Sequence, residues 1–294
     1  MTLNAHHRLQ ARNVKFDWLN TPQPWLPNDP FTAHFINVLH LLLPEGELWF
    51  CRLYNQALPD ISDDRLRDDV KGFVRQEAIH SRSHQAVLDR YFARHGIVTE
   101  PFTRRIRWLF TEVLGDQPFG ISLGWEWLAR WWLTFRLGLI AAIEHFTCVI
   151  GRWILECKAL EDAGADPVMM DLLRWHGAEE VEHRNVAHDL FEARGGGYFY
   201  RVSLMLLVGP VLILLWWLGT RYFLRQQAPA LRQVRFWHEW RRAAHQDRLP
   251  TIAFLLAWVR RYLRRGYHPQ GEADTAMALD YLKRSPAALR ALAR

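Results

Sequence analysis

The sequence predicts an all-α protein: an up-and-down bundle of four long helices, then a hydrophobic helix and a basic helical C-terminal region. Apolar residues recur at helical spacing in four long segments, turn residues separate these segments, and no stretch alternates β-branched residues as strands do. With 294 residues, half of them apolar, the chain can bury a large core. The expected divisions are an N-terminal extension (1–30), the bundle (31–197), the hydrophobic helix (198–226) and the basic region (227–294).

Turn signals place the ends of the four bundle helices. The first helix contains FTAHFINVLHLLL and ends before Pro59, and Ser62 is expected to cap the second. Gly96 ends the second helix, and a connection of roughly 25 residues leads to the third, which contains WLARWWLTFRLGLIAAIEHF. AGADP at 163–167 separates the third from the fourth, and GGG at 195–197 closes the fourth.

Carboxylates and imidazoles recur at matched spacing inside these apolar helices. The second and fourth helices each contain a Glu-x-x-His motif, and a lone glutamate precedes each motif by 30 or 36 residues, in PEGELWF and LIAAIEHF. At about 100° per residue, His176, Glu180 and His183 project from one stripe of the fourth helix, and Glu179 lies close enough to act as a substitute. Glu182 is expected to point elsewhere.

Such a set of side chains favours a pair of metal ions inside the bundle. A lone glutamate in an apolar helix has a high desolvation cost unless it is paired or metal-bound, and two neighbouring ions need several carboxylates plus imidazoles. Oxygen and imidazole ligands suit two iron ions, or manganese. No catalytic residue distinct from the ligands is expected. The predicted ligands are Glu47, Glu77, His80, Glu144, His176, Glu180 and His183.

The alternative interpretations are structural. Each Glu-x-x-His motif taken alone is compatible with an ordinary exposed helix face, and only the combination of four matched groups favours a metal site. His176 could instead be a core histidine or one that supports a ligand. His84, His145 and His188 are expected to be structural or to support ligands. Cys51 and Cys148 are expected to lie beside the site as small buried apolar residues.

Residues 30–195 resemble the ferritin-like di-iron carboxylate proteins, whose ligands follow the order carboxylate, Glu-x-x-His, Glu, Glu-x-x-His. The resemblance implies that Glu47, Glu77 and His80 serve mainly one metal, and that Glu144, Glu180 and His183 serve mainly the other. His-x-x-x-Glu-x-x-His on the fourth helix is similar to the arylamine N-oxygenases, in which an additional histidine completes the site. PEGELWF, RQEAIHSRSH and GAEEVEHRNVAHD together resemble a bacterial family called predicted metal-dependent hydrolases.

The expected reaction is O₂ activation at two iron ions to oxidise an apolar, lipid-like or aromatic small molecule. The chain has no Gly-rich dinucleotide loop, so electrons would come from an external donor. The alternative enzyme is a bimetallic hydrolase that acts on an ester or phosphoester. A third hypothesis is a non-catalytic metal-binding protein.

After the bundle the sequence indicates contact with a membrane. Residues 202–219 carry no charge and are the only stretch expected to be long enough for a span, whereas residues 221–268 contain eleven arginines against Glu239 and Asp247. This arginine excess favours a helix that dips into one leaflet, with anionic lipid as partner, over a crossing; a buried core helix is the alternative.

Three scattered cysteines and an N-terminus without an apolar leader segment predict a cytoplasmic protein at the inner face of the membrane. No nucleic-acid-binding fingerprint is present, so no nucleic acid partner is expected. A homodimer is kept as an alternative assembly.

Overall fold

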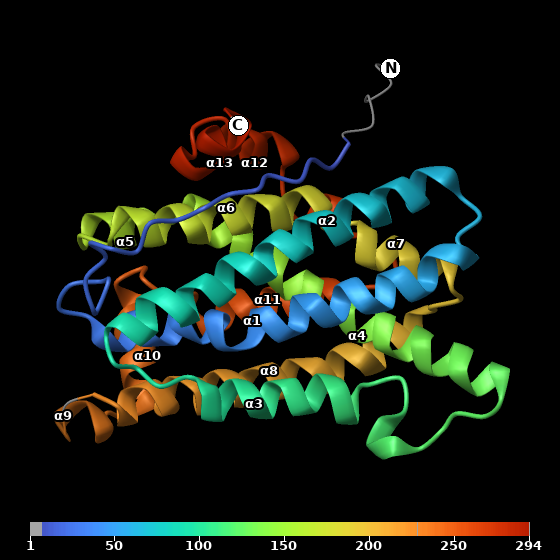
Figure 1. The fold of residues 1–294 in the computed structure, drawn as a ribbon, viewed down its shortest axis with the longest axis horizontal. Helices are drawn as coiled ribbons and strands as arrows, with labels where there is room; N and C mark the ends of the chain where they lie inside the picture. The colour runs from blue at the N-terminus through green and yellow to red at the C-terminus, as the bar shows by residue number, and fades with distance from the viewer. Residues whose placement is uncertain (1–7, 228, 294) are drawn as a thin grey trace.

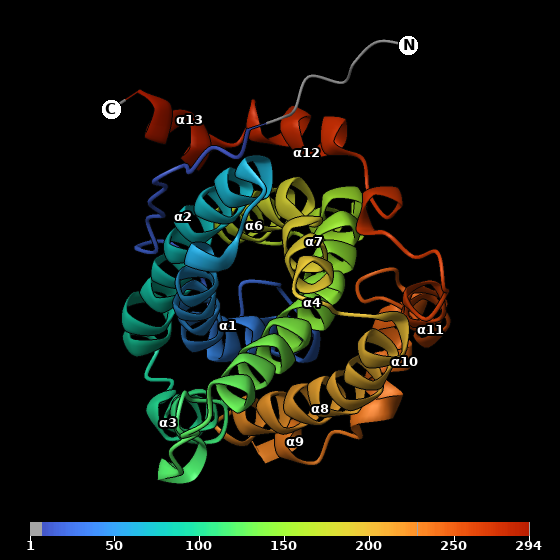
Figure 2. The same cartoon turned by 90° about the vertical axis from the view of Figure 1, so that its right-hand side faces the viewer.

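The computed structural model describes residues 8–227 and 229–293, and within these ranges it contains helices and turns but no strand. The predicted all-α class is confirmed. The long helices α1, α2, α4 and α6 pack on one another to form the bundle (Figures 1 and 2). Their bounds are α1 Pro30–Ala57, α2 Asp64–Ala86, α4 Glu126–Glu156 and α6 Pro167–His183.

The second helix begins one residue later than the sequence predicts. Its N-cap is Asp63, not Ser62, and the Asp63 carboxylate accepts a hydrogen bond of 2.7 Å from the backbone N–H of Leu66. The first helical residue is Asp64, so Ser62 lies outside the capping position. At its other end, α2 continues into a π-helical turn, Val87–Phe92.

The connection between the second and third bundle helices is itself folded. It forms α3 (Glu100–Trp108), a π-helical turn (Leu109–Val113) and a 3₁₀ turn (Pro118–Gly120). After a short α5 (Ala159–Asp162), the predicted fourth helix is interrupted just past the Glu-x-x-His motif. It is completed by α7 (Val186–Ala193).

The helices α4 and α6 cross with almost no side chain between them. A Cβ atom built on Gly151 would lie 2.6 Å from the carbonyl oxygen of Gly177, closer than any real Cβ contact. Glycine at both positions therefore lets the two backbones touch. Glu144 lies about two helical turns from this crossing and Glu180 about one, so the close approach keeps the two carboxylates near each other.

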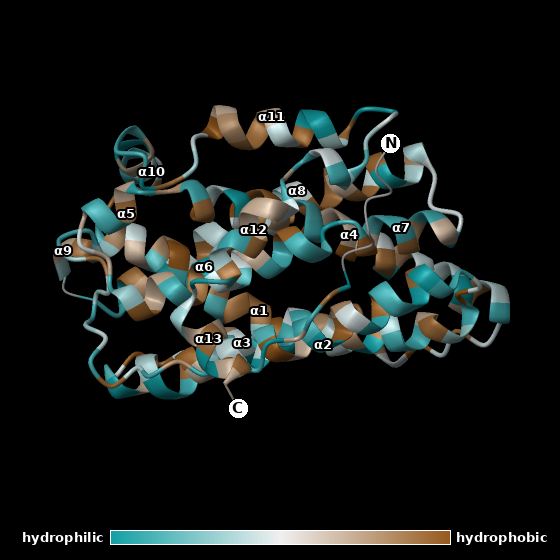
Figure 3. Cartoon of the chain, turned by 90° about the horizontal axis from the view of Figure 1, so that it is seen from above, coloured by the Kyte–Doolittle hydropathy of each residue, from teal (hydrophilic) through white to brown (hydrophobic). Residues whose placement is uncertain are grey.

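The remaining helices cover the bundle. They are α8 (Tyr198–Arg225), α9 (Pro229–Arg232), α10 (Phe236–His245), α11 (Ile252–Tyr262), α12 (Thr275–Leu282) and α13 (Pro286–Leu292). α8 packs on α1 and α4, whereas α12 and α13 pack on α6 at the opposite side of the molecule (Figures 1 and 2). α11 changes along its length from apolar to basic (Figure 3).

Two helices are long and apolar enough to cross a membrane, where the sequence predicted one such stretch. In α4, 72% of the most apolar window is buried, because this helix lies in the core. In α8 only 22% of that window is buried. Length and composition do not separate these two cases, since a core helix and a lipid-facing helix are both rich in apolar residues.

Candidate metal centre

The two Glu-x-x-His motifs and the two lone glutamates meet in the interior of the bundle. α1 supplies Glu47, α2 and α6 supply the motifs, and α4 supplies Glu144. With His176, these side chains form overlapping groups in which ligand atoms lie within 4.8 Å of one another. Every one of the seven residues is at most 5% exposed. The structure therefore brings together all the residues that the sequence singled out as ligands.

One end of the cluster surrounds the imidazole of His183. Its Nε2 atom lies 3.3 Å from a carboxylate oxygen of each of three glutamates, which come from α2, α4 and α6. These are Glu77, Glu144 and Glu180. Four side chains from three helices thus converge on one point.

The other end contains two imidazoles. His176 Nε2 lies 2.8 Å from Glu180 Oε1 and 3.5 Å from Glu47 Oε1. His80 Nδ1 lies 3.3 Å from Glu77 Oε1 and 3.5 Å from Glu180 Oε1. Glu77 and Glu180 contact imidazoles at both ends, so these two carboxylates occupy the middle of the cluster.

The atoms that face the centre of the cluster lack hydrogen-bond partners. Buried polar atoms are rarely left in this state, since an unsatisfied buried group costs about 1–3 kcal/mol. Carboxylate oxygens with imidazole nitrogens form a hard-to-borderline donor set suited to iron or manganese. The residues therefore fit a metal centre. The unpartnered atoms include both oxygens of Glu47, Glu77 and Glu144, together with Glu180 Oε2, His80 Nδ1, His176 Nε2 and His183 Nε2.

In each of the three imidazoles, the ring nitrogen that does not face the centre of the cluster contacts another polar side chain. His80 Nε2 lies 2.9 Å from Glu179 Oε2, His183 Nδ1 lies 3.1 Å from Gln76 Oε1, and His176 Nδ1 lies 3.2 Å from His84 Nε2. Metal-binding histidines commonly have such an outer partner, which fixes the tautomer and the ring orientation. Glu179 thus supports His80 and does not take the place of Glu180.

A buried ion-pair network supports two of these partners. Arg12 Nη1 lies 2.8 Å from Glu179 Oε1 and 2.7 Å from Glu182 Oε2, and Gln76 Nε2 donates to Glu182 Oε2 at 3.0 Å. Glu182 does face away from the metal cluster, but it is buried and paired. Arg12 belongs to the N-terminal segment, whose contacts with α2 and α6 include Leu9 against Gly72 (Figure 1).

The sequence analysis did not identify Arg12 or Gln76. Glu179 and Glu182 are three residues apart, hence on one helical face, and such a buried pair requires a cation. That signal does not say which of many arginines supplies it. Arg12 is separated from Glu179 by 167 positions in the chain.

Among the remaining histidines and cysteines, His84 has a ring nitrogen within 4.8 Å of ligand atoms of Glu47 and His176, but both of its nitrogens contact other imidazoles. His84 contacts His40 with 2.8 Å between their Nδ1 atoms, and burial lowers the pKa of His40 to about 3, so that ring is neutral. His145 contacts the Tyr267 hydroxyl at 2.8 Å. Burial raises the pKa of the Cys51 thiol to about 12, which keeps it protonated.

Electrostatics in the metal-free cluster favour bound protons. Burial, followed by the charge of Glu180, raises the pKa of Glu144 to about 8, and burial also raises the pKa of Glu47. Burial lowers the pKa of His183, but the neighbouring charges of Glu180 and Glu144 more than offset this and raise it well above its usual value. The metal-free protein therefore carries protons that a metal must displace.

We expect metal affinity to rise with pH up to at least about 8, because bound protons compete with the metal below the raised pKa of Glu144. Each displaced proton should contribute about a tenfold change in affinity per pH unit. Competition with a chromophoric chelator across this range measures the slope. An affinity that does not change between about pH 6 and pH 8 would contradict the expectation.

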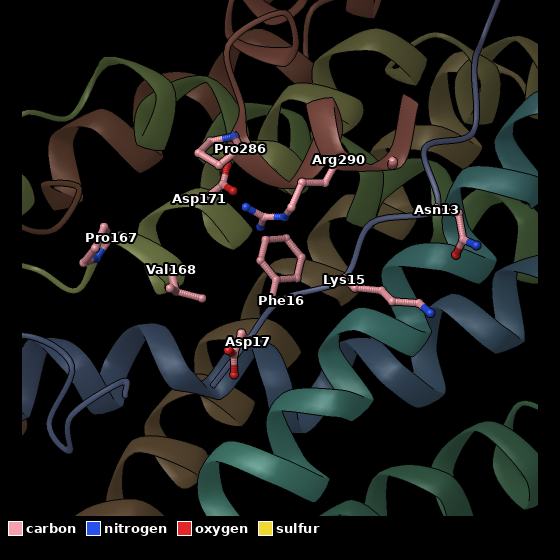
Figure 4. A pocket seen from close by; sticks show the side chains of 10 residues that line it. Asn13, Lys15, Phe16, Asp17, Pro167, Val168, Asp171, Pro286 and Arg290 are labelled. Carbon is pink, nitrogen blue, oxygen red and sulfur yellow. The ribbon is translucent and has the colours of Figure 1, made fainter. Parts of the chain in front are cut away.

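A cleft elsewhere on the molecule is lined by none of the seven predicted ligands. It has a volume of about 400 Å³ and lies between the N-terminal segment, the start of α6 and α13 (Figure 4). Asp171 lines it, but its carboxylate accepts hydrogen bonds from Tyr281 Oη, Ser285 Oγ and the backbone N–H of Ala287. Asp171 therefore anchors the C-terminal helices.

Comparison with known proteins agrees with a metal-dependent enzyme. The model of one family, described as predicted metal-dependent hydrolases, matches residues 10–273. No significant match was found among curated proteins or among solved structures. The matched range includes Arg12 and all seven predicted ligands. The family description corresponds to the hydrolytic alternative. It does not correspond to the oxidative reaction that the sequence analysis placed first. The chain belongs to the family of predicted metal-dependent hydrolases.

Proposed function

We propose that the cluster binds two divalent metal ions and that the protein is a metal-dependent hydrolase acting on an ester or phosphoester. The main support is the set of inward-facing carboxylate and imidazole atoms that crowd together without a hydrogen-bond partner. Such ions, when bound, would activate a water nucleophile and polarise the oxygen of the bond to be broken. Four carboxylates also carry the charge that two divalent cations neutralise.

The positions of the side chains suggest how they share the two ions. Glu77 and Glu180 would hold the metal from the middle of the cluster, because both contact imidazoles at its two ends. Glu144 and His183 would complete one site. The other would be completed by Glu47, His80 and His176.

Residues of the chain would also control the surroundings of the reaction. Glu179 and Gln76 hold the rings of His80 and His183 in fixed orientations. The burial of the cluster excludes bulk water, and electrostatic interactions are stronger where water is excluded.

The proposal is tested by stripping the purified chain of metal and reloading it anaerobically with Mn(II), Zn(II) or Fe(II). We expect two ions per chain and metal-dependent hydrolysis of p-nitrophenyl esters or phosphoesters. Glu144→Ala should lower both the metal content and the rate of hydrolysis, because it removes a carboxylate from one end of the cluster. Full metal loading without hydrolysis of any substrate in the panel would reject the hydrolase and leave the oxidative enzyme or a non-catalytic metal-binding protein.

O₂ activation at iron is the second candidate, and burial of the cluster is the observation that favours it. With all seven side chains at most 5% exposed, a small molecule such as O₂ reaches the centre more easily than an ester does. Protein loaded with Fe(II) should be mixed with O₂, given an external electron donor, and followed by optical and Mössbauer spectroscopy. Rapid, stoichiometric oxidation of both iron ions would favour this candidate over hydrolysis.

A further inference from the structure

The outer side of α8 is apolar along most of its length. Its inner side packs on α1 and α4, whereas large apolar side chains on the outer side are between 36% and 75% exposed. A contiguous apolar surface of this kind normally marks an interaction site. These residues are Phe199, Leu206, Leu207, Val211, Ile213, Leu214, Trp217 and Leu218.

A second group of exposed apolar residues lies on α3, the following connection and the start of α4. Both views place these elements and α8 on the side of the molecule away from α12 and α13 (Figures 1 and 2). Four of the six residues in this group are tryptophan, which prefers the interface between lipid and water. Together with the α8 residues we call it the apolar face; its members are Trp108, Phe119, Ile121, Trp125, Trp127 and Trp131.

The charges on and after α8 have one sign, whereas in the second group the exposed Glu126 lies between Trp125 and Trp127 and pairs with Arg130. The chain contains no acidic residue between Glu192 and Glu239, a range that includes the whole of α8 and six arginines. Arg221 and Arg225 lie at the end of α8, where the Arg221 guanidinium is 5.8 Å from the centre of the Trp217 ring. An apolar surface bordered by cations complements a lipid leaflet with anionic headgroups.

We propose that the apolar face binds one leaflet of an anionic phospholipid bilayer, with α8 lying in the plane of the membrane. This inference does not depend on the reaction of the metal centre. The occupant is lipid and not a second copy of the chain, because two α8 helices packed together would bring only positive charges, such as Arg221 and Arg225, into their contact, with no acidic residue on either helix.

The inner side of α8 argues against a crossing. A Cβ atom on Gly219 would lie 2.8 Å from Val38, so α8 and α1 are in close contact. At the other end Arg201 is buried, donates to the carbonyl oxygen of Arg264 at 2.7 Å, and packs on the rings of Tyr262 and Tyr267. A crossing would have to separate α8 from these partners and place Arg201 in lipid, which is costly.

Vesicle co-sedimentation of the purified full chain tests the proposal. We expect binding to vesicles that contain phosphatidylglycerol, and weaker binding to pure phosphatidylcholine or at high salt. Leu206→Glu and Leu214→Glu should each weaken binding about tenfold or more, since each removes a lipid-buried side chain. Arg221→Gln should weaken it by about fivefold, and only with anionic vesicles.

The matched control carries the same chemical change on the opposite side of the molecule. Leu289 on α13 is 48% exposed, like the target leucines, and Leu289→Glu should leave vesicle binding unchanged. Circular dichroism verifies the fold of each variant. Equal loss in Leu214→Glu and Leu289→Glu would overturn the proposal. The proposal would also be overturned if the wild-type protein is a dimer in ultracentrifugation, Leu214→Glu converts it to a monomer, and neither protein binds vesicles.

The depth of α8 distinguishes lying in the leaflet from crossing it. A spin label at Leu214→Cys should report a depth of about 5–10 Å below the headgroups, and a label at Leu289→Cys should remain in water. The three native cysteines are buried and therefore react slowly with the label. A label at position 214 located at the bilayer centre would contradict the in-plane arrangement.

Discussion

Replacement of Glu180 with alanine is expected to abolish binding of the proposed metal pair. The Glu180 carboxylate lies 2.8 Å from His176 Nε2 and 3.3 Å from His183 Nε2, so its two oxygens serve both ends of the cluster. Loss of an outer partner alone typically costs 10–100-fold in metal affinity, and loss of a central ligand should cost more than about 100-fold. Metal content after dialysis against a weak chelator, measured by inductively coupled plasma mass spectrometry, provides the test.

Two further variants make the Glu180 result specific. Glu144 contacts only the His183 end of the cluster, so Glu144→Ala should retain about one ion where Glu180→Ala retains none. Glu126→Ala changes an exposed carboxylate that pairs with Arg130 on the surface, and it should keep the full metal content. Unchanged metal content in Glu180→Ala would show that the buried cluster is not a metal centre.

Replacement of Arg12 with methionine is expected to destabilise the metal-free fold by about 3–5 kcal/mol, because the loss of one partner leaves buried carboxylates uncompensated. Arg12 is the cation that contacts both Glu179 and Glu182, and all three are buried. Urea unfolding of the metal-free protein measures the loss, since bound metal would add its own stabilisation. The same variant should also bind metal more weakly, because Glu179 would no longer hold His80 in place.

A compensating variant separates charge from shape in this network. Arg12→Met combined with Glu179→Gln and Glu182→Gln removes the uncompensated charges, and it should recover most of the lost free energy of unfolding. Arg104→Met is the matched surface control. Its ion pair with Glu100 is exposed and 3.8 Å long, so the change should cost less than about 1 kcal/mol. If Arg12→Met is as stable as Arg104→Met, the buried network does not contribute to folding.

The local pattern of the sequence was sufficient for the helices and for the carboxylate and imidazole side chains that converge in the bundle. Spacing of apolar residues gives a helix wherever one face is buried, and Glu-x-x-His puts two side chains on one such face. The error at Ser62 was one residue, because several consecutive polar residues can cap the same helix. Likewise, an apolar helix long enough to cross a membrane occurs twice, and only burial separates α4 from α8.

The sequence by itself therefore determined the helical class and the seven side chains that meet in the bundle, because both depend on spacing within one helix. Only the tertiary structure decided that Glu77 and Glu180 occupy the middle of the cluster, that Arg12 balances Glu179 and Glu182, and that α8 keeps an apolar side uncovered. These features depend on which surfaces of distant segments touch. Many pairings satisfy the same local pattern, and packing in three dimensions selects one of them.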